Sequence, residues 1–193
     1  MKKACLLTGD PGVGKTTIIK QALNKVQARA GGFFTEEIRA GRVRQGFRIV
    51  TLDGHSAILA HIDIKSPYRV SKYGVDIESL DKVGVAAIRE AIKKCDLVVI
   101  DEIGKMELFS PYFKEAVLEA INSEKRVLGT IMRTSHPWAD EIKRHPNVAL
   151  ISLTKANQEQ VLGQVLEWLK PNKQSWKMRL KKWQSAHRWF RLS

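Results

Sequence analysis

The sequence predicts an α/β fold in which a mostly parallel sheet carries helices on both faces and a β-hairpin insertion. Most of the chain alternates short apolar runs with segments of helical periodicity, which is the pattern of parallel strands joined by helices. Residues 32–62 differ, because they hold β-like runs punctuated by the turn pairs Ala40-Gly41 and Asp53-Gly54. Ligands of such sheets bind beyond the carboxyl ends of the parallel strands, so functional residues are expected there.

Strands and helices are expected along the chain as far as Lys170. In order they are a strand at 4–8, a helix at 16–28, β-like runs at 32–38, 46–52 and 57–62, a loop at 66–77, a helix at 79–94, a strand at 97–100, a helix at 111–123, a strand at 126–132, a helix at 138–144, a strand at 148–153 and a helix ending at 170. Caps mark two of the helix starts. Ser110 precedes Pro111, a proline suited to the first position of a helix, and Thr154 is the expected cap of the last helix.

Composition and charge indicate a globular domain followed by a basic extension. Hydrophobic residues make up 44% of the 193 residues. No apolar run approaches the roughly 18 residues that a membrane-spanning helix needs. The formal net charge is +13, and residues 172–193 contribute seven basic side chains and no acid. Because this change falls at Pro171, we predict a folded domain at 1–170 and a separate, Trp-rich extension at 171–193.

The N-terminus and the cysteines both favour a cytoplasmic location. The apolar start of the chain breaks at Gly9-Asp10 after a few residues, so it lacks the pattern of a signal peptide. Cys5 falls in the first predicted strand and Cys95 at the end of a predicted helix. We expect both to be small, buried side chains rather than partners in a disulfide, as is usual inside cells.

A phosphate-binding pattern, G-x-x-x-x-G-K-[ST], occurs at residues 9–16 between a predicted strand and a predicted helix, the setting that this pattern requires. Its glycines let backbone N–H groups converge on a β-phosphate, and the start of the helix adds the positive end of its dipole. Lys15 should bridge the β- and γ-phosphates, and the Thr16 hydroxyl should ligate Mg²⁺. An ordinary glycine-rich turn would not need all of these fixed positions. The residues expected to bind the nucleotide are Gly9, Asp10, Pro11, Gly12, Val13, Gly14, Lys15, Thr16 and Thr17.

A second pattern is the apolar run at 97–100, which is followed by two acids. In proteins with such a loop, a buried strand that ends in Asp holds Mg²⁺, so Asp101 is the second residue expected at the metal. Glu102 comes one position later, where its carboxylate can accept a hydrogen bond from a water in line with the γ-phosphorus. A phosphotransferase has to exclude that water. The acid pair therefore predicts hydrolysis, with Lys15 and Glu102 as catalytic residues.

Several further segments follow one another along the chain: G-F-F-T-E-E-I-R at 32–39, G-F-R-I-V at 46–50, Y-G-V at 73–75, D-E-I-G-K-M-E-L-F-S at 101–110 and H-P at 136–137. With the loop, they resemble the small nucleoside-triphosphatase family known from thermophiles and as the human cancer-related NTPase. The resemblance runs from Met1 to about Lys170. It implies a RecA-like P-loop fold and slow, Mg²⁺-dependent hydrolysis of ATP, GTP and other nucleoside triphosphates. Low base selectivity fits this sequence, which has no Asn-Lys-x-Asp motif for reading guanine.

Transition-state charge on the γ-phosphoryl group requires a cation in addition to Lys15 and Mg²⁺. Arg133 follows the strand at 126–132, whose carboxyl end should face the nucleotide, and Lys105 follows the acid pair by three residues. We favour Arg133 over Lys105 as the catalytic cation, although each also suits a solvated position on a loop.

Four other side chains have two possible roles each. Thr130 and His136 lie in the same stretch as Arg133 and are candidates to orient water or phosphate, but His136 before a proline also suits a turn. Glu36 and Glu37 suit a contact with metal or water, or ion pairs with neighbouring arginines. We leave both acids out of the catalytic set.

The extension departs from the family resemblance. On a helix, its aromatic face would consist of Trp176, Leu180, Trp183, His187 and Phe190. Such a basic amphipathic segment suits disorder or docking on its own domain, an anionic membrane surface, or binding to nucleic acid or a protein partner. Two rival functions stay open for the chain: a nucleotide or small-molecule kinase, and a nucleic-acid-stimulated ATPase or nucleotide switch. Glu102 and the lack of an Arg-rich lid argue against a kinase.

Overall fold

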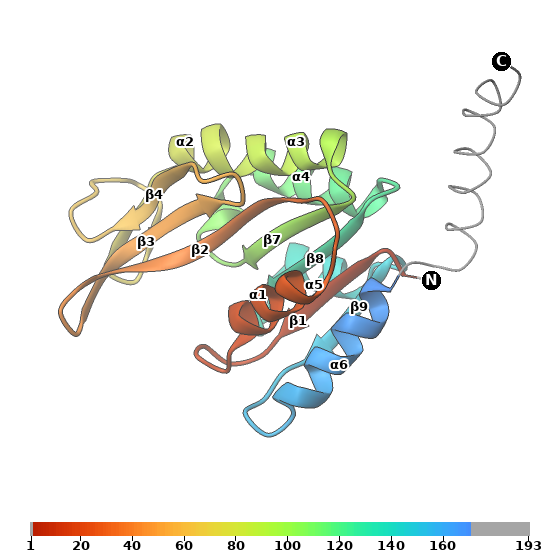
Figure 1. The fold of residues 1–193 in the computed structure, drawn as a ribbon. Helices are drawn as coiled ribbons and strands as arrows, with labels where there is room; N and C mark the ends of the chain where they lie inside the picture. Colours follow the sequence, from red (N-terminus) through yellow and green to blue (C-terminus); the bar gives the residue numbers. More distant parts are fainter. Residues whose placement is uncertain (1, 171–193) are drawn as a thin grey trace, which may run out of the picture.

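The computed structural model of the chain describes residues 2–170, so the predicted extension at 171–193 lies outside the described residues. Within residues 2–170, nine strands form one sheet (Figure 1). They are β1 (Ala4–Thr8), β2 (Ala30–Ala40), β3 (Val43–Thr51), β4 (Ser56–His61), β5 (Arg69–Val70), β6 (Tyr73–Val75), β7 (Leu97–Ile103), β8 (Arg126–Ile131) and β9 (Val148–Ser152). Their order across the sheet is β5-β6-β4-β3-β2-β7-β8-β1-β9.

The sheet has two halves with different pairing. Strands β2, β7, β8, β1 and β9 pair in parallel, and we call them the parallel half. Strands β3, β4, β6 and β5 continue from β2 by antiparallel pairing, and we call them the antiparallel half. The predicted α/β fold with a hairpin insertion is therefore confirmed, and the insertion makes the whole sheet mixed.

Helices cover both faces of the parallel half. One face carries α1 (Lys15–Lys25) and α6 (Gln158–Leu169), and the other carries α3 (Ala86–Lys94), α4 (Pro111–Asn122) and α5 (Pro137–Arg144). Because side chains alternate along a strand, β1 serves both layers. Leu7 belongs to the apolar cluster of Ile19 in α1, and Leu6 to that of Phe113 in α4. Within residues 2–170, no helix has the length and apolar character needed to cross a bilayer.

The antiparallel half is covered less completely. The single-turn helix α2 (Ile77–Ser79) leads into a π-helical segment, η1 (Leu80–Val85), and Leu80 belongs to the same buried cluster as Ile49 of β3 and Leu59 of β4. Two apolar side chains of this half stay exposed, Val43 at 56% and Ile58 at 48%. In Figure 1 the β2–β3 hairpin projects past α1, beyond the helices of the parallel half.

Four expectations are wrong in detail. Residues 66–77 contain the hairpin β5–β6, whose strands of two and three residues are too short to show a periodicity. The first helix ends at Lys25, because Val26 has an extended backbone. The last helix starts at Gln158 with Asn157 as its N-cap, while the Thr154 amide donates to the Asn157 side chain at 2.8 Å. Cys5 is buried, but Cys95 is only half-buried; both are free.

The strand order brings the two sequence patterns to one edge of the sheet. Strand β1 leads into the glycine-rich loop and β7 ends in the acid pair, and β8 lies between them. The register pairs Leu7 of β1 with Thr130 of β8, and Ile100 of β7 with Gly129 of β8. The loop, Thr130 and the acids therefore lie at the same level, at the carboxyl ends of three parallel strands.

Candidate active site

The path of the glycine-rich loop requires glycine at two positions. Gly14, the N-cap of α1, has φ +93°, a conformation that side chains disfavour. A Cβ on Gly9 would lie 2.4 Å from the carbonyl oxygen of Leu153. Gln158 holds the loop from its other side, since its Nε2 donates to the carbonyl of Val13 at 2.8 Å. The first turn of α1 carries no acid, so its amide groups favour an anion at this point.

Lys15 lies against the loop from which it extends. Its Nζ donates to the carbonyl oxygens of Gly9 at 3.0 Å and Asp10 at 3.3 Å. A cavity of about 590 Å³ lies beside it, and the loop supplies one wall of that cavity: Pro11, Gly12, Gly14, Lys15, Thr16 and Thr17. We call this the loop cavity. The strand β7 and the segment after it supply a second wall that includes Asp101 and Glu102.

Asp101 is buried, with 2% exposure, and one of its two carboxylate oxygens accepts a hydrogen bond. The Thr130 hydroxyl, from the strand between β1 and β7, donates to Asp101 Oδ1 at 2.6 Å. Asp101 Oδ2 has no hydrogen-bond partner among the described residues. Burial raises the pKa of Asp101, and hydrogen bonds from the Thr130 and Thr16 hydroxyls act in the opposite direction. Thr130 therefore orients an acid, a role that differs from the orientation of water or phosphate considered from the sequence.

The pair of Thr16 and Asp101 fits a small, hard cation. A buried carboxylate oxygen without a partner, beside a threonine hydroxyl, offers the oxygen ligands that Mg²⁺ prefers. Within residues 2–170 there is no cluster of three or more His, Cys, Asp or Glu side chains that could hold a metal. The cation would therefore take its remaining ligands from water and phosphate, as Mg²⁺ does in nucleotide sites.

Two further acids border the loop cavity. Glu102 is half-buried, and burial raises the pKa of its carboxyl group, with the charge of Lys15 lowering it and that of Asp101 raising it further. Glu107 is buried, and its carboxylate accepts a hydrogen bond from the Gly104 amide at 3.1 Å. Burial raises the pKa of Glu107 to about 8. Sequence reasoning missed Glu107, because an acid within an apolar segment shows its burial only in the fold.

The two cations considered from the sequence lie in different places. Arg133 pairs with the Asp10 side chain at 2.7 and 2.8 Å, and both side chains are mostly exposed. The pair borders a separate hollow of about 480 Å³ beside Leu153. Lys105 lines the loop cavity. A third cation of that cavity, Arg44 of β3, was not singled out from the sequence.

The remaining candidates lie outside the loop cavity or pair with cations. His136 precedes α5 as its N-cap and its amide donates to Asp140 at 3.2 Å, which agrees with the turn reading. Glu36 pairs with Lys20 at 3.1 Å and with Arg48 at 3.0 Å. Glu37 pairs with the arginines of the β2–β3 hairpin, Arg39 and Arg44.

A phosphate loop between a buried strand and a helix, with an acid pair at the end of a strand two places away, defines the class of P-loop nucleotide-binding proteins. The chain belongs to the NTPase family, whose family model matches residues 4–166.

Relatives and solved structures agree with this membership. The chain is 46% identical to the nucleoside-triphosphatase THEP1 of Thermotoga maritima, covering 87% of this chain and 96% of the relative. It is 43% identical to the protein of the same name from Methanocaldococcus jannaschii, with 83% and 93% covered. The crystal structure of THEP1 from Aquifex aeolicus matches with a TM-score of 0.78 at 37% identity, covering 87% of this chain and 99% of that one. The solution structure of a human cancer-related nucleoside triphosphatase matches with a TM-score of 0.74 at 35% identity, covering 87% and 97%. The resemblance and the fold class expected from the sequence are confirmed.

Proposed function

We propose that the chain hydrolyses nucleoside triphosphates to the diphosphate and inorganic phosphate, with Mg²⁺ and with little selectivity for the base. One observation carries the proposal: the loop residues Lys15 and Thr16 share a single cavity with Asp101 and Glu102. Family membership and the names of the relatives support the reaction class. Low base selectivity is supported by the absence of an Asn-Lys-x-Asp motif from the sequence.

Each residue of the proposed site has one task. The loop amides and the dipole of α1 bind the β-phosphate, and Lys15 leaves the loop carbonyls to contact the β- and γ-phosphates. Thr16 and Asp101 hold Mg²⁺, and Thr130 fixes the orientation of the Asp101 carboxylate. The bound cation supplies neutralisation of charge on the phosphate oxygens.

Of the two acids, Asp101 and Glu102, we assign the catalytic role to Glu102. Its carboxylate accepts a hydrogen bond from the attacking water and aligns it with the γ-phosphorus. The water oxygen bonds to phosphorus, the bond to the β-phosphate oxygen breaks, and the water proton ends on phosphate. Glu102 is half-buried and lines the loop cavity together with Lys15 and Thr16, which supports this assignment.

Phosphate release tests the proposal. Purified protein is assayed with ATP, GTP, CTP and UTP, with and without Mg²⁺, and we expect Mg²⁺-dependent release from all four. Glu102→Gln should lower the single-turnover rate by at least ~10²-fold, the scale of acid–base assistance, while nucleotide still binds. Glu107→Gln serves as a matched control, because Glu107 is also an acid that borders the loop cavity, five residues after Glu102.

Three results would contradict parts of the proposal. Equal hydrolysis by Glu102→Gln and wild type would remove Glu102 from the catalytic set. Transfer of the γ-phosphoryl group to an added acceptor without hydrolysis would establish a kinase. Release that depends on added RNA or DNA would establish a nucleic-acid-stimulated ATPase.

We also propose that the protein works in the cytoplasm, which its free cysteines and its nucleotide substrate support.

A further inference from the structure

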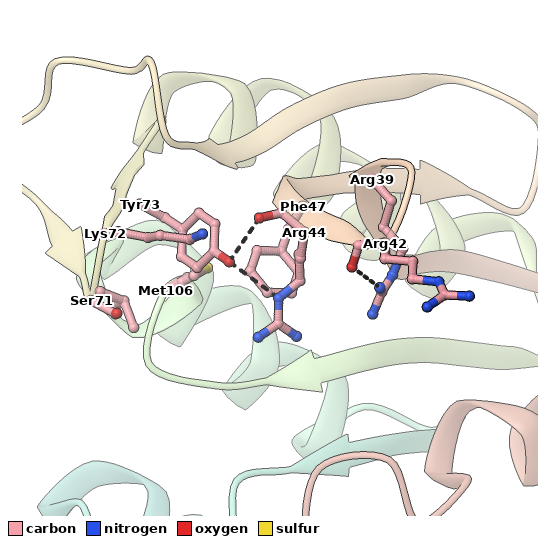
Figure 2. A pocket seen from close by; sticks show the side chains of 9 residues that line it. Arg39, Arg42, Arg44, Phe47, Ser71, Lys72, Tyr73 and Met106 are labelled. Carbon is pink, nitrogen blue, oxygen red and sulfur yellow. Dashed lines mark hydrogen bonds between the residues drawn. The ribbon is translucent and has the colours of Figure 1, made fainter.

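Arg44 connects the loop cavity with a second, basic pocket. The second pocket, of about 550 Å³, is drawn in Figure 2 and shares Arg44, Phe47, Val70 and Met106 with the loop cavity. The two hollows therefore adjoin each other, and Arg44 borders both. In Figure 2 the Arg44 side chain lies beside Tyr73 and Phe47, with its Nε hydrogen-bonded to the Tyr73 hydroxyl. Arg44 extends from the antiparallel half and lines the same cavity as Lys15, Thr16 and Glu102.

The contacts that hold Arg44 can be exchanged. Its Nη1 donates to Glu37 Oε1 at 2.6 Å and its Nε donates to the Tyr73 hydroxyl at 3.2 Å. The guanidinium carbon lies 5.1 Å from the centre of the Phe47 ring. The arginine side chain is 42% exposed, so these contacts are near the surface and weak.

Glu37 does not depend on Arg44 for a partner. Its other oxygen, Oε2, accepts a hydrogen bond from Arg39 Nε at 2.7 Å. If Arg44 turned into the loop cavity, Glu37 would keep one guanidinium, and the Tyr73 hydroxyl would keep its bond to the Arg44 carbonyl oxygen at 3.4 Å. The release of Arg44 therefore leaves no carboxylate without a cation.

The loop cavity needs such a group. Hydrolysis spreads negative charge over the γ-phosphoryl oxygens, and an arginine that contacts them is worth ~10³-fold or more in rate. Arg133 is engaged by Asp10 in a separate hollow. A guanidinium can form two parallel hydrogen bonds to a phosphoryl group, which the ammonium of Lys105 cannot.

We propose that Arg44 is the cation that contacts the γ-phosphoryl oxygens in the transition state, exchanging Glu37 for the phosphoryl group. The proposal rests on the hydrolysis proposed above and adds a catalytic residue from the hairpin insertion. It assigns to Arg44 the role for which the sequence alone favours Arg133. Arg44 forms hydrogen bonds only, so the balance of the hydrolysis is unchanged.

Single-turnover hydrolysis by matched arginine variants tests the proposal. Arg44→Ala should lose ~10³-fold in rate with nucleotide affinity within a few-fold of wild type. Arg48→Ala is the control, because Arg48 lies on the same strand, pairs with Glu36 and borders neither cavity. Arg133→Ala and Lys105→Ala complete the comparison, and both should stay within about tenfold of wild type. Binding of ADP with aluminium fluoride, which imitates the transferring phosphoryl group, should be lost in Arg44→Ala and kept in Arg48→Ala.

A structural role for Arg44 predicts a different outcome. If Arg44 only stabilised the hairpin through Glu37, Glu37→Gln would lower the rate as much as Arg44→Ala. Our proposal expects Glu37→Gln to hydrolyse as fast as wild type or faster, and it can be measured even if Arg44→Ala fails to fold. Equal rates and equal aluminium fluoride binding in Arg44→Ala and Arg48→Ala would overturn it, as would a slow Glu37→Gln that still binds nucleotide. Absence of hydrolysis in the wild type would instead reject the proposed function.

Discussion

The parallel and antiparallel halves of the sheet are stabilised in different ways. Apolar side chains fill both faces of the parallel half, where Val99 and Ile100 of β7 are fully buried on opposite sides. The antiparallel half leaves apolar side chains such as Ile58 exposed, and the ion pairs along its border with β2, such as Glu36 of β2 with Arg48 of β3, are of a kind that contributes at most about 1 kcal/mol each. The residues that we propose to bind phosphate and metal therefore lie on the parallel half, whereas Arg44, which we propose to exchange partners, lies on the antiparallel half.

The largest effect is expected at the phosphate loop, which belongs to the parallel half. Lys15→Ala should lower both nucleotide affinity and turnover, the latter by ~10³-fold, because the lost contact stabilises ground state and transition state together. The fold should survive, since Lys15 makes only loop contacts. Lys20→Ala on the same helix is the control, because Lys20 pairs with Glu36 on β2. Titration with ATP and Mg²⁺ measures the affinity, and a wild-type value for Lys15→Ala would show that the loop has been misassigned.

Two isoleucines compare the halves directly. Ile100→Ala on β7 should lower the free energy of unfolding by about 2–5 kcal/mol, since it opens a cavity in the core. Ile58 on β4 is 48% exposed, and Ile58→Ala should cost less than about 1 kcal/mol. Urea unfolding of both variants measures the difference. Equal losses would mean that the antiparallel half is as tightly packed as the parallel half.

Glu107, on the segment that borders both halves, should make stability depend on pH. Its pKa is about 8 in the folded chain, above the ordinary value of 4.5, because burial and the nearby acids Glu102 and Asp101 favour the neutral form. The unfolded chain releases this proton first, so its contribution is full below about pH 4.5 and is lost as the pH rises through about 8. Glu107→Gln should flatten this decline between pH 5 and 9 in urea unfolding. The same slope in both proteins would contradict the prediction.

The smallest effect is expected from the extension. Truncation after Pro171 should leave Mg²⁺-dependent hydrolysis within a few-fold of the full chain, because α6 ends at Leu169 and Lys15, Thr16, Asp101 and Glu102 all precede it. Cosedimentation with anionic and neutral vesicles compares the two proteins at low and high salt. Equal, negligible binding would reject a membrane-surface role for 171–193, and a large loss of thermal stability on truncation would favour docking on the domain.

The parallel half could be predicted from the sequence because short sequence patterns determine its loop and the ends of its helices and strands. A glycine pattern, an apolar run and a proline after a cap each carry their signal within a few residues, so the loop, Asp101 and the start of α4 could be predicted. Support across long distances could not be predicted. Gln158 reaches Val13 from 145 residues away, and Thr130 reaches Asp101 from the neighbouring strand, 29 residues further along the chain.

The antiparallel half was harder to interpret from sequence. The hairpins within residues 32–62 were expected, but the β5–β6 hairpin was not, and nothing in the sequence distinguishes Arg44 from the other basic residues near the turn at Ala40-Gly41. Its place in the loop cavity depends on how far β3 runs beside β2 and on how the sheet twists, and neither leaves a local pattern. Arg133 had the better position by strand order, yet its nearest acid, Asp10, belongs to the loop itself and engages it.

The strand β8 sets the distance between the backbones of β1 and β7. Adjacent strands in a sheet lie about 4.8 Å apart, so the backbones of β1 and β7, with β8 between them, are separated by two such steps, or about 10 Å. This width is fixed by ladders of backbone hydrogen bonds and does not depend on any side chain. Substitutions on the β2–β3 hairpin can change the side chains that line the loop cavity, but they leave the spacing between β1 and β7 unchanged.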